Sequence, residues 1–315
     1  MLNLSALFVM VALMLSCGRQ DKKAQGYHLE FYQSGNIRIG ILPEVGGRIV
    51  HLGLIGRENI FKQDTVLWRE HPAEKPLMNF VNGYKPYHGH VVWPAPMSQW
   101  WQHQDLYPDK KQLGARWPPD PYLDYAAYDL SQSGGTFRLQ GPASPISGIR
   151  MVKTIEIISN NAVLFEVMAE NVTRARKGLA LWLNTRLPGT CKCYVPVASA
   201  LDARYKKSAS AEQDTLRTLI RDGFFTFVSD STGSKKKLAV TKAYIYPAKP
   251  YMAAFNRDQV IIIRFPHHNK EDIHIEHALV EIFQQRSKLA NEDLLELEYQ
   301  SAFQDMAPEI GRAHV

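Results

Sequence analysis

Two alternating glutamates near the C-terminal end are the first candidates for chemistry in this 315-residue chain. In residues 293–299, Glu296 and Glu298 alternate with Leu295 and Leu297. A strand there would place both carboxylates on one face and both leucines on the other. One interpretation is a strand whose charged face lies in solvent. The other is a carboxylate on the ligand-binding face of a sheet, where it could give or accept a proton.

An aromatic, proline-rich segment at residues 68–128 offers a different kind of chemistry. It holds five of the six tryptophans, including Trp93 and Trp117. It is too rich in proline for a continuous strand and too aromatic for a solvated loop, so we expect a loop packed across one end or face of a sheet. Aromatic faces stack on the apolar faces of sugar rings, and nearby polar side chains bond the hydroxyls. The alternative is that the tryptophans only fill the core.

Polar side chains interleave with these tryptophans and could bond a ligand. His90 is a candidate general acid or base, because an imidazole with a pKa of about 6.5 exchanges protons near neutrality. His88 and His90 could also hold a metal, completed by His267 and His268 or by His274 and His277. No glutamate or cysteine stands at a recognised ligand spacing, so no metal is expected. The other polar candidates in this segment are Asn82 and Asp120.

Composition and motifs narrow the class of protein. The chain is 45% hydrophobic and 22% charged, which excludes a disordered chain. Lys plus Arg number 37 against 31 Asp plus Glu, and a net charge of +6 is too mild to indicate a nucleic-acid partner. The sequence contains no GxGxxG, Walker or GxSxG motif. We therefore expect no nucleotide cofactor and no serine-hydrolase chemistry.

Short aliphatic and aromatic segments separated by turns must position these side chains. Because they follow one another too closely for intervening helices, they predict an all-β protein with a large antiparallel sandwich or barrel. The expected strands are Ile37–Leu42, Arg48–Leu54, 149–158, 162–170, 178–184, 238–244, 259–265, 279–283 and 294–299.

The N-terminus predicts export and a lipid anchor. Residues 1–16 carry no charged side chain, and their apolar stretch is too short to span a membrane. Cys17 follows, as in a bacterial lipoprotein signal whose cysteine is lipidated; an ordinary secretory signal is the alternative. Residues 17–26 are then a tether and 27–315 a single domain. This predicts a monomeric, lipid-anchored protein of the cell envelope, periplasmic or on the outer membrane.

Several motifs together resemble the galactose mutarotase-like superfamily. HGHVVWPAP and WPPDP, beginning at His88 and Trp117, are similar to the GGHRLWxAPE and WPPDP blocks of a bacterial lipoprotein family in that superfamily. ILPEVGGRIVHLGLIGRENIF at residues 41–61 and VLFEVMAENVTRARKGLALWLNTRLPG at residues 163–189 resemble its N-terminal hairpin and central strands. The resemblance implies one antiparallel β-supersandwich with a carbohydrate site on its concave face.

The resemblance also implies roles for individual residues. In aldose 1-epimerases a glutamate is the base at the anomeric hydroxyl and a histidine the acid at the ring oxygen. The closing strand makes Glu298 the first choice of base and Glu296 the second. The epimerase histidine follows the central strand, where this chain has Asn184 and Arg186, so His90 would have to supply the acid. Val91 and Met97 replace the motif's Arg and Glu. These replacements weaken the expectation of catalysis more than the expectation of sugar binding.

The sequence thus predicts a carbohydrate-binding lipoprotein whose partner is a sugar or oligosaccharide. It acts either as an aldose epimerase or related sugar-modifying enzyme, or as a non-catalytic glycan-binding or protein-interaction component of a glycan-utilisation system. The expected catalytic residues are Glu298 and His90. The expected binding residues are Arg48, Asn82, His88, Trp93, Trp117, Asp120, Asn184, Arg186 and Glu296.

Overall fold

The computed structural model describes residues 27–69, 84–207, 216–228, 238–287, 290–308 and 311–315. Asn82, Cys17 and the expected signal and tether at residues 1–16 and 17–26 lie outside the described residues. In the described part of the chain, no helix is both long and apolar enough to cross a membrane.

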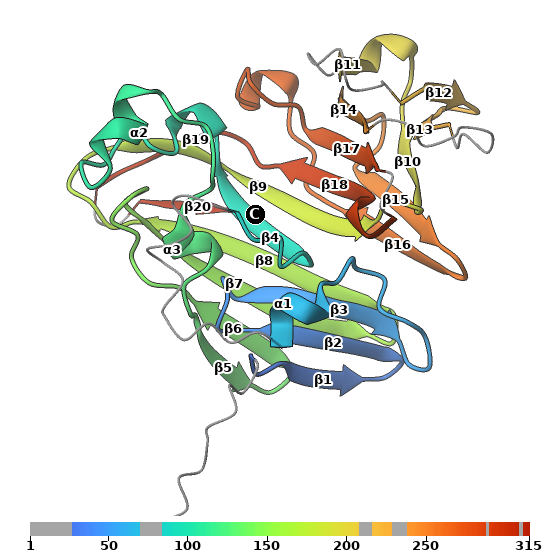
Figure 1. The fold of residues 1–315 in the computed structure, drawn as a ribbon, viewed down its shortest axis with the longest axis horizontal. Coiled ribbons are helices and arrows are strands. Elements are labelled where there is room, and N and C mark those ends of the chain that lie inside the picture. The colour runs from blue at the N-terminus through green and yellow to red at the C-terminus, as the bar shows by residue number, and fades with distance from the viewer. Residues whose placement is uncertain (1–26, 70–83, 208–215, 229–237, 288–289, 309–310) are drawn as a thin grey trace, which may run out of the picture.

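A ten-stranded antiparallel sheet is the largest element of the structure (Figure 1). Its first strands follow chain order, but C-terminal strands then pair beside strands from the middle of the chain. The spatial order is β1 (Glu30–Ser34), β2 (Ile37–Leu42), β3 (Arg48–Leu54), β4 (His90–Ala95), β9 (Lys177–Pro188), β18 (Leu294–Gln300), β17 (Val280–Arg286), β14 (Ala239–Ile245) and β11 (Ala203–Lys207), with β19 (Gln304–Met306) pairing with β9.

Two five-stranded antiparallel sheets complete the structure. One runs β12 (Thr218–Arg221), β13 (Phe224–Phe227), β10 (Lys192–Pro196), β15 (Tyr251–Asn256), β16 (Gln259–Arg264). The other runs β20 (Arg312–His314), β8 (Ala162–Asn171), β7 (Ile149–Ser159), β6 (Thr136–Gln140), β5 (Asp129–Ser133). The predicted all-β, antiparallel sandwich is confirmed.

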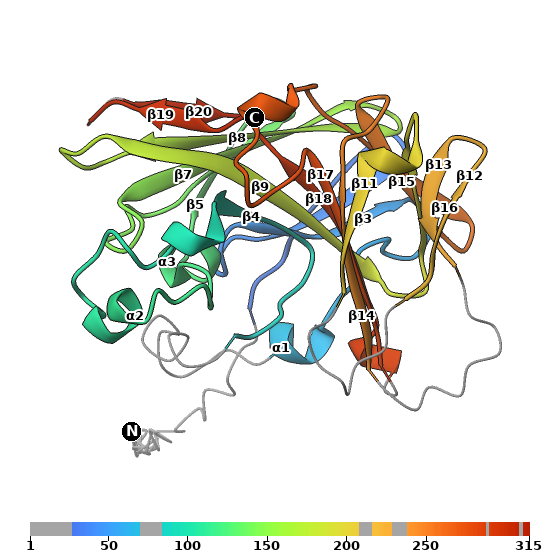
Figure 2. The same ribbon diagram turned by 90° about the horizontal axis from the view of Figure 1, so that it is seen from above.

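Helices are short and few in the described residues. Figure 2 shows α2 and α3 close to each other at the lower left, on the opposite side of the molecule from β19 and β20. They are α1 (Thr65–Arg69), α2 (Pro108–Gln112) and α3 (Pro121–Asp124), with single 3₁₀ turns at Met97–Gln99, Ala200–Asp202, Lys270–Asp272 and Ala290–Glu292.

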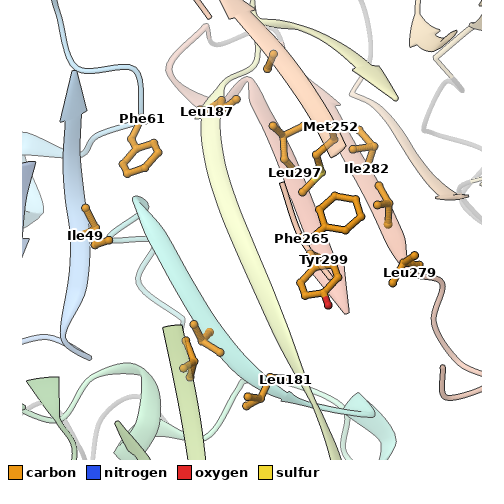
Figure 3. Close-up of a cluster of buried hydrophobic side chains, with 14 of the residues drawn as sticks. Ile49, Phe61, Leu181, Leu187, Met252, Phe265, Leu279, Ile282, Leu297 and Tyr299 are labelled. Carbon is orange, nitrogen blue, oxygen red and sulfur yellow. The ribbon is translucent and has the colours of Figure 1, made fainter. Parts of the chain in front are cut away.

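Strand alternation gives the large sheet two different faces. In β18, Leu295, Leu297 and Tyr299 point into the main hydrophobic core. The Tyr299 ring stacks on Phe265 at 4.8 Å, and Figure 3 shows Met252 from β15 beside them. The opposite face, which we call the site face, carries the glutamates of β18. Because successive side chains in a strand alternate, one strand serves the core and the site together.

Strand β4 lies within the segment expected to be a loop, so that expectation is wrong for residues 90–95. It pairs along its length with β9 but with β3 only through Ile49 and His90. Pro94 stands opposite Leu181, whose backbone N–H and C=O both bond Ser301 instead. The missing N–H of Pro94 therefore interrupts no ladder, and a proline is tolerated inside the sheet.

His90 points to the core face of β4, away from Glu298. The register places it opposite Thr185, whose hydroxyl lies 2.8 Å from His90 Nδ1, and its ring contacts Phe165 of β8. Burial, together with the charge of Lys153, lowers the pKa of His90 to about 3. The prediction that His90 works with Glu298 is wrong, because the two side chains lie on opposite faces of the sheet.

A buried ion pair fixes the aromatic segment to the site face. Arg48 of β3 is completely buried, lies 2.9 Å from Asp124 Oδ1 and donates to the Asp124 carbonyl at 2.6 Å. Trp93 Nε1 donates to the same carboxylate at 2.9 Å. A Cβ on Gly46, which has a φ of +67°, would lie 2.2 Å from that carbonyl oxygen, so only glycine fits. Arg48 is an anchor and not, as predicted, a sugar ligand.

Replacing Arg48 tests this anchor. Arg48→Met leaves the Asp124 carboxylate buried without its cation, so we expect the free energy of unfolding to fall by about 3–5 kcal/mol. Lys111→Met is the control, because Lys111 pairs with the exposed Asp105 in the same segment; it should change stability little. Urea unfolding measures both. Equal effects of the two substitutions would contradict the anchor.

The low pKa of His90 predicts a pH-dependent stability. Below its ordinary pKa of about 6.5 an unfolded histidine binds a proton, whereas folded His90 does not until about pH 3. Stability therefore falls as the pH decreases through this window. His90→Gln should reduce this slope by about 1.4 kcal/mol per pH unit between about pH 6 and pH 4. Unfolding at several pH values measures it, and an unchanged slope would place His90 in solvent.

Candidate functional site

The site face gathers polar side chains from four neighbouring strands of the large sheet. The register places Glu298 of β18 between Asn184 of β9 and Glu281 of β17. Trp182 of β9 stands opposite Gln300 on the same face. All five of these side chains are buried. Buried polar groups need hydrogen-bond partners, so the contacts of these side chains show which of their atoms remain available to a ligand.

One lysine joins two buried carboxylates at the centre of this surface. Lys242 Nζ lies 2.8 Å from Glu298 Oε2 and 2.6 Å from Glu281 Oε2. Trp182 Nε1 also donates to Glu298 Oε2, at 2.8 Å. His277 Nδ1 lies 2.9 Å from Glu281 Oε1. The result is a continuous chain from His277 through Glu281 and Lys242 to Glu298, which we call the Lys242 network.

Burial and charge act differently on the two glutamates. Burial raises the pKa of Glu298 well above its ordinary value and outweighs the opposing charge of Lys242, and the nearby carboxylates of Glu281 and Glu296 add to the rise. Burial also opposes ionisation of Glu281, but Lys242 and His277 outweigh it and lower its pKa to about 2. Since Glu281 is ionised, His277 Nδ1 donates to it, and in the neutral imidazole Nε2 is then an acceptor.

Several buried polar atoms beside the network have no hydrogen-bond partner among the described residues. They are Glu298 Oε1, His277 Nε2 and both side-chain polar atoms of Asn184 and of Gln300. Asn184 and Gln300 are themselves completely buried. Native proteins seldom leave such atoms unpaired. Their gathering on one surface makes this part of the site face the candidate functional site.

Aromatic rings form a wall next to these atoms. The Trp182 ring lies 5.4 Å from His277, 5.1 Å from Trp93 and 6.1 Å from Trp100, over which it stacks. Trp93 and Trp100 are buried, whereas Trp117 is 46% exposed. The wall is therefore buried where it contacts the Lys242 network and exposed to solvent at Trp117.

A second ion pair on the site face is self-contained. Arg186 Nε lies 2.9 Å from Glu296 Oε1, and its Nη1 donates to the hydroxyl of Tyr84. The guanidinium also lies 5.2 Å from the centre of the Trp93 ring. Arg186 and Glu296 thus occur together on the predicted face, but they mainly satisfy each other.

Two further predicted ligands are buried, and one of them has a structural role. Asp120 is buried as the N-cap of α3, accepting from Tyr122 N at 2.9 Å and from Ser144 Oγ at 2.5 Å. His88 is buried beside Arg186, Lys62 and Arg48, and burial with these charges lowers its pKa to about 2. The Asp120 carboxylate is therefore already occupied, which corrects that prediction, whereas the buried His88 keeps its Nδ1 without a hydrogen-bond partner among the described residues. Trp93 lies beneath the other rings, with its N–H already donated to Asp124.

Sequence reasoning missed Lys242, Glu281 and Trp182, and considered His277 only as a metal ligand. A signal was present for two of them. Lys242 and Glu281 are single charges within the otherwise uncharged segments AVTKAYI and ALVEIF. A lone charge in an apolar strand needs a buried partner. Within the described part of the chain, no three His, Cys, Asp or Glu side chains are arranged to hold a metal.

Comparisons with solved structures bear on the fold. The Slr1438 protein from Synechocystis sp. PCC 6803 is 11% identical with a TM-score of 0.53, covering 91% of this chain and 93% of its own. A candidate aldose 1-epimerase from Escherichia coli K12 is 9% identical with a TM-score of 0.50, covering 92% and 97%. A galactose mutarotase related enzyme from Lactobacillus acidophilus is 7% identical with a TM-score of 0.49, covering 91% and 95%.

The fold is therefore galactose mutarotase-like, as the resemblance implied. No curated protein matches the sequence. Residues 29–313 match a sequence family along nearly the whole described chain, and the protein belongs to that family, Domain of unknown function (DUF4380).

Proposed function

We propose that this protein binds a sugar on the site face and exchanges its anomers, as an aldose 1-epimerase does. The observation that carries the proposal is the Lys242 network, which ends in two unpartnered atoms, Glu298 Oε1 and His277 Nε2. Anomer exchange needs one acid and one base on the same sugar. A carboxyl and an imidazole with free atoms on one surface supply that pair.

The charges of the network are compatible with one proton that lies either on Glu298 or on His277. Lys242 and ionised Glu281 balance each other. If Glu298 keeps its proton and His277 is neutral, the network is neutral. If the proton moves to His277, each new ion lies next to an opposite charge, His277 beside Glu281 and Glu298 beside Lys242. Both states are compensated, which low-dielectric surroundings require.

The proposed reaction uses this proton twice. His277 Nε2 takes the proton of the anomeric hydroxyl while the bond between the anomeric carbon and the ring oxygen breaks. The electron pair of that bond goes to the ring oxygen, which takes the proton of Glu298. Rotation of the resulting aldehyde and the reverse steps give the other anomer and restore both side chains. Burial raises the pKa of Glu298, so it begins as the acid.

The surroundings suit a neutral, ring-shaped ligand. Asn184 and Gln300 can each donate and accept, as sugar hydroxyls do. Trp182 lies against both His277 and Lys242, at 5.4 and 4.6 Å from its ring. A predicted lipid anchor at Cys17 would hold this site at the cell envelope.

Non-catalytic glycan binding is the second candidate function. Val91 stands opposite Asn184 on the site face, at the position where the resembling motif has arginine. An aliphatic side chain there removes a cation that could bind substrate or stabilise charge. Sugar binding through Asn184, Gln300 and Trp182 does not need that cation.

Glu298→Gln separates these functions. The amide keeps the shape of the side chain but carries no transferable proton, so anomer exchange should fall by about 100-fold or more while binding changes little. Polarimetry or exchange NMR of glucose, galactose, mannose and xylose measures the rate, and calorimetry measures binding.

Glu166→Gln is the control for that substitution, because Glu166 is exposed on β8. It should leave the exchange rate unchanged. Wild-type rates in Glu298→Gln would refute the catalytic role of Glu298. Binding without accelerated exchange in the wild type would establish the non-catalytic function instead.

A further inference from the structure

We infer that Trp117 forms a second sugar subsite, separate from the Lys242 network, and that the ligand is therefore an oligosaccharide rather than a single sugar. This inference rests on the proposed function, because it assigns the first sugar to the network. The observation that carries it is an indole that contacts three other rings and is nevertheless 46% exposed.

Packing fixes the Trp117 ring without covering it. Its centre lies 4.8 Å from Tyr84, 6.0 Å from Trp93 and 6.2 Å from Trp100. Trp93 itself is anchored through its N–H to Asp124. Even so, 46% of Trp117 remains exposed. A large, immobilised aromatic surface in contact with water is favourable for stacking, because little conformational entropy is lost on binding.

Two other indoles connect the exposed ring to the network. Trp93 and Trp100 each contact both Trp117 and Trp182, and Trp182 donates to Glu298. The two contacts through Trp93 limit the separation of the Trp117 and Trp182 ring centres to about 11 Å. A second or third ring linked to a sugar on the network can reach across that distance to Trp117.

A contact between neighbouring loops joins the two subsites. We call the surface between His277 and Trp117, along this contact, the rim. Arg116 precedes Trp117, Glu276 precedes His277, and Arg116 Nη1 lies 3.4 Å from Glu276 Oε2. Ser98 Oγ donates to the other oxygen of Glu276. The loop that carries His277 is thereby joined to the segment that carries Trp117. A ligand leaving the network along this rim passes Trp117.

The chemistry of Trp117 favours a sugar ring over a charged group. Stacking on the face of an indole uses the apolar C–H surface of a pyranose and requires no polar partner. Arg116, the nearest charge in sequence, is already paired with Glu276. A neutral oligosaccharide therefore fits the rim.

Binding of sugars of increasing length tests the subsite. The probes are glucose with maltose and maltotriose, glucose with cellobiose and cellotriose, and mannose with mannobiose and mannotriose, titrated by calorimetry. In a series that binds, we expect the trisaccharide to bind about five- to tenfold more tightly than the monosaccharide. Trp117→Ala should remove this gain and leave monosaccharide affinity unchanged. Trp117→Phe should keep part of the gain.

Two further variants keep the outcomes distinct. Leu113→Ala, at an 81% exposed position in the same segment, is the control and should behave like wild type. Asn184→Ala should weaken every member of a series equally. Equal affinity for mono- and trisaccharides, or a gain that survives Trp117→Ala, overturns the subsite. A gain that depends on Trp117 but not on Asn184 overturns the network as the first sugar site. Absence of any binding overturns both.

Discussion

The site depends on one interaction, in which the Lys242 ammonium group pairs with both Glu281 and Glu298. Glu281 and Glu298 stand directly opposite each other on adjacent strands, and like charges in that arrangement are destabilising. Each buried ion also costs several kcal/mol of desolvation. A third strand, β14, brings Lys242 within hydrogen-bond distance of both carboxylates. Without it, the pair could remain buried only in protonated form, and no ionised partner would orient His277.

A second constraint separates this polar surface from the core. The leucines of β18 pack in the core while its glutamates lie on the site face, so the register of one strand positions both. The Arg48–Asp124 pair then fixes the aromatic segment over the same face. The aromatic wall is therefore held by an ion pair that has no part in the proposed chemistry.

Local sequence patterns predicted the strand that carries the glutamates, but not the features that depend on which distant strands pair. The alternation at Glu296 and Glu298 identified the strand and its carboxylate face, because a period of two survives in any sheet. The loop expected around Trp93 is instead a strand, since the cost of Pro94 depends on which side its missing N–H faces. His90 was assigned to the wrong face because its orientation follows from a register with β9, more than 80 residues away. Lys242 and Glu281 required knowledge of which distant strands pair.

His277 lies at a different place in the fold from the histidine that the resemblance implies. The resemblance implies a histidine after the central strand, but there Arg186 is engaged with Glu296 and Tyr84, and Asn184 faces Glu298. His277 instead comes from the turn before β17, and its ring reaches the same surface because Glu281, four residues on, accepts from it. Glu276 ties that turn to Ser98 and Arg116. The proposed reaction needs two groups held at one surface, and in that proposal the second group comes from a loop rather than from the central strand.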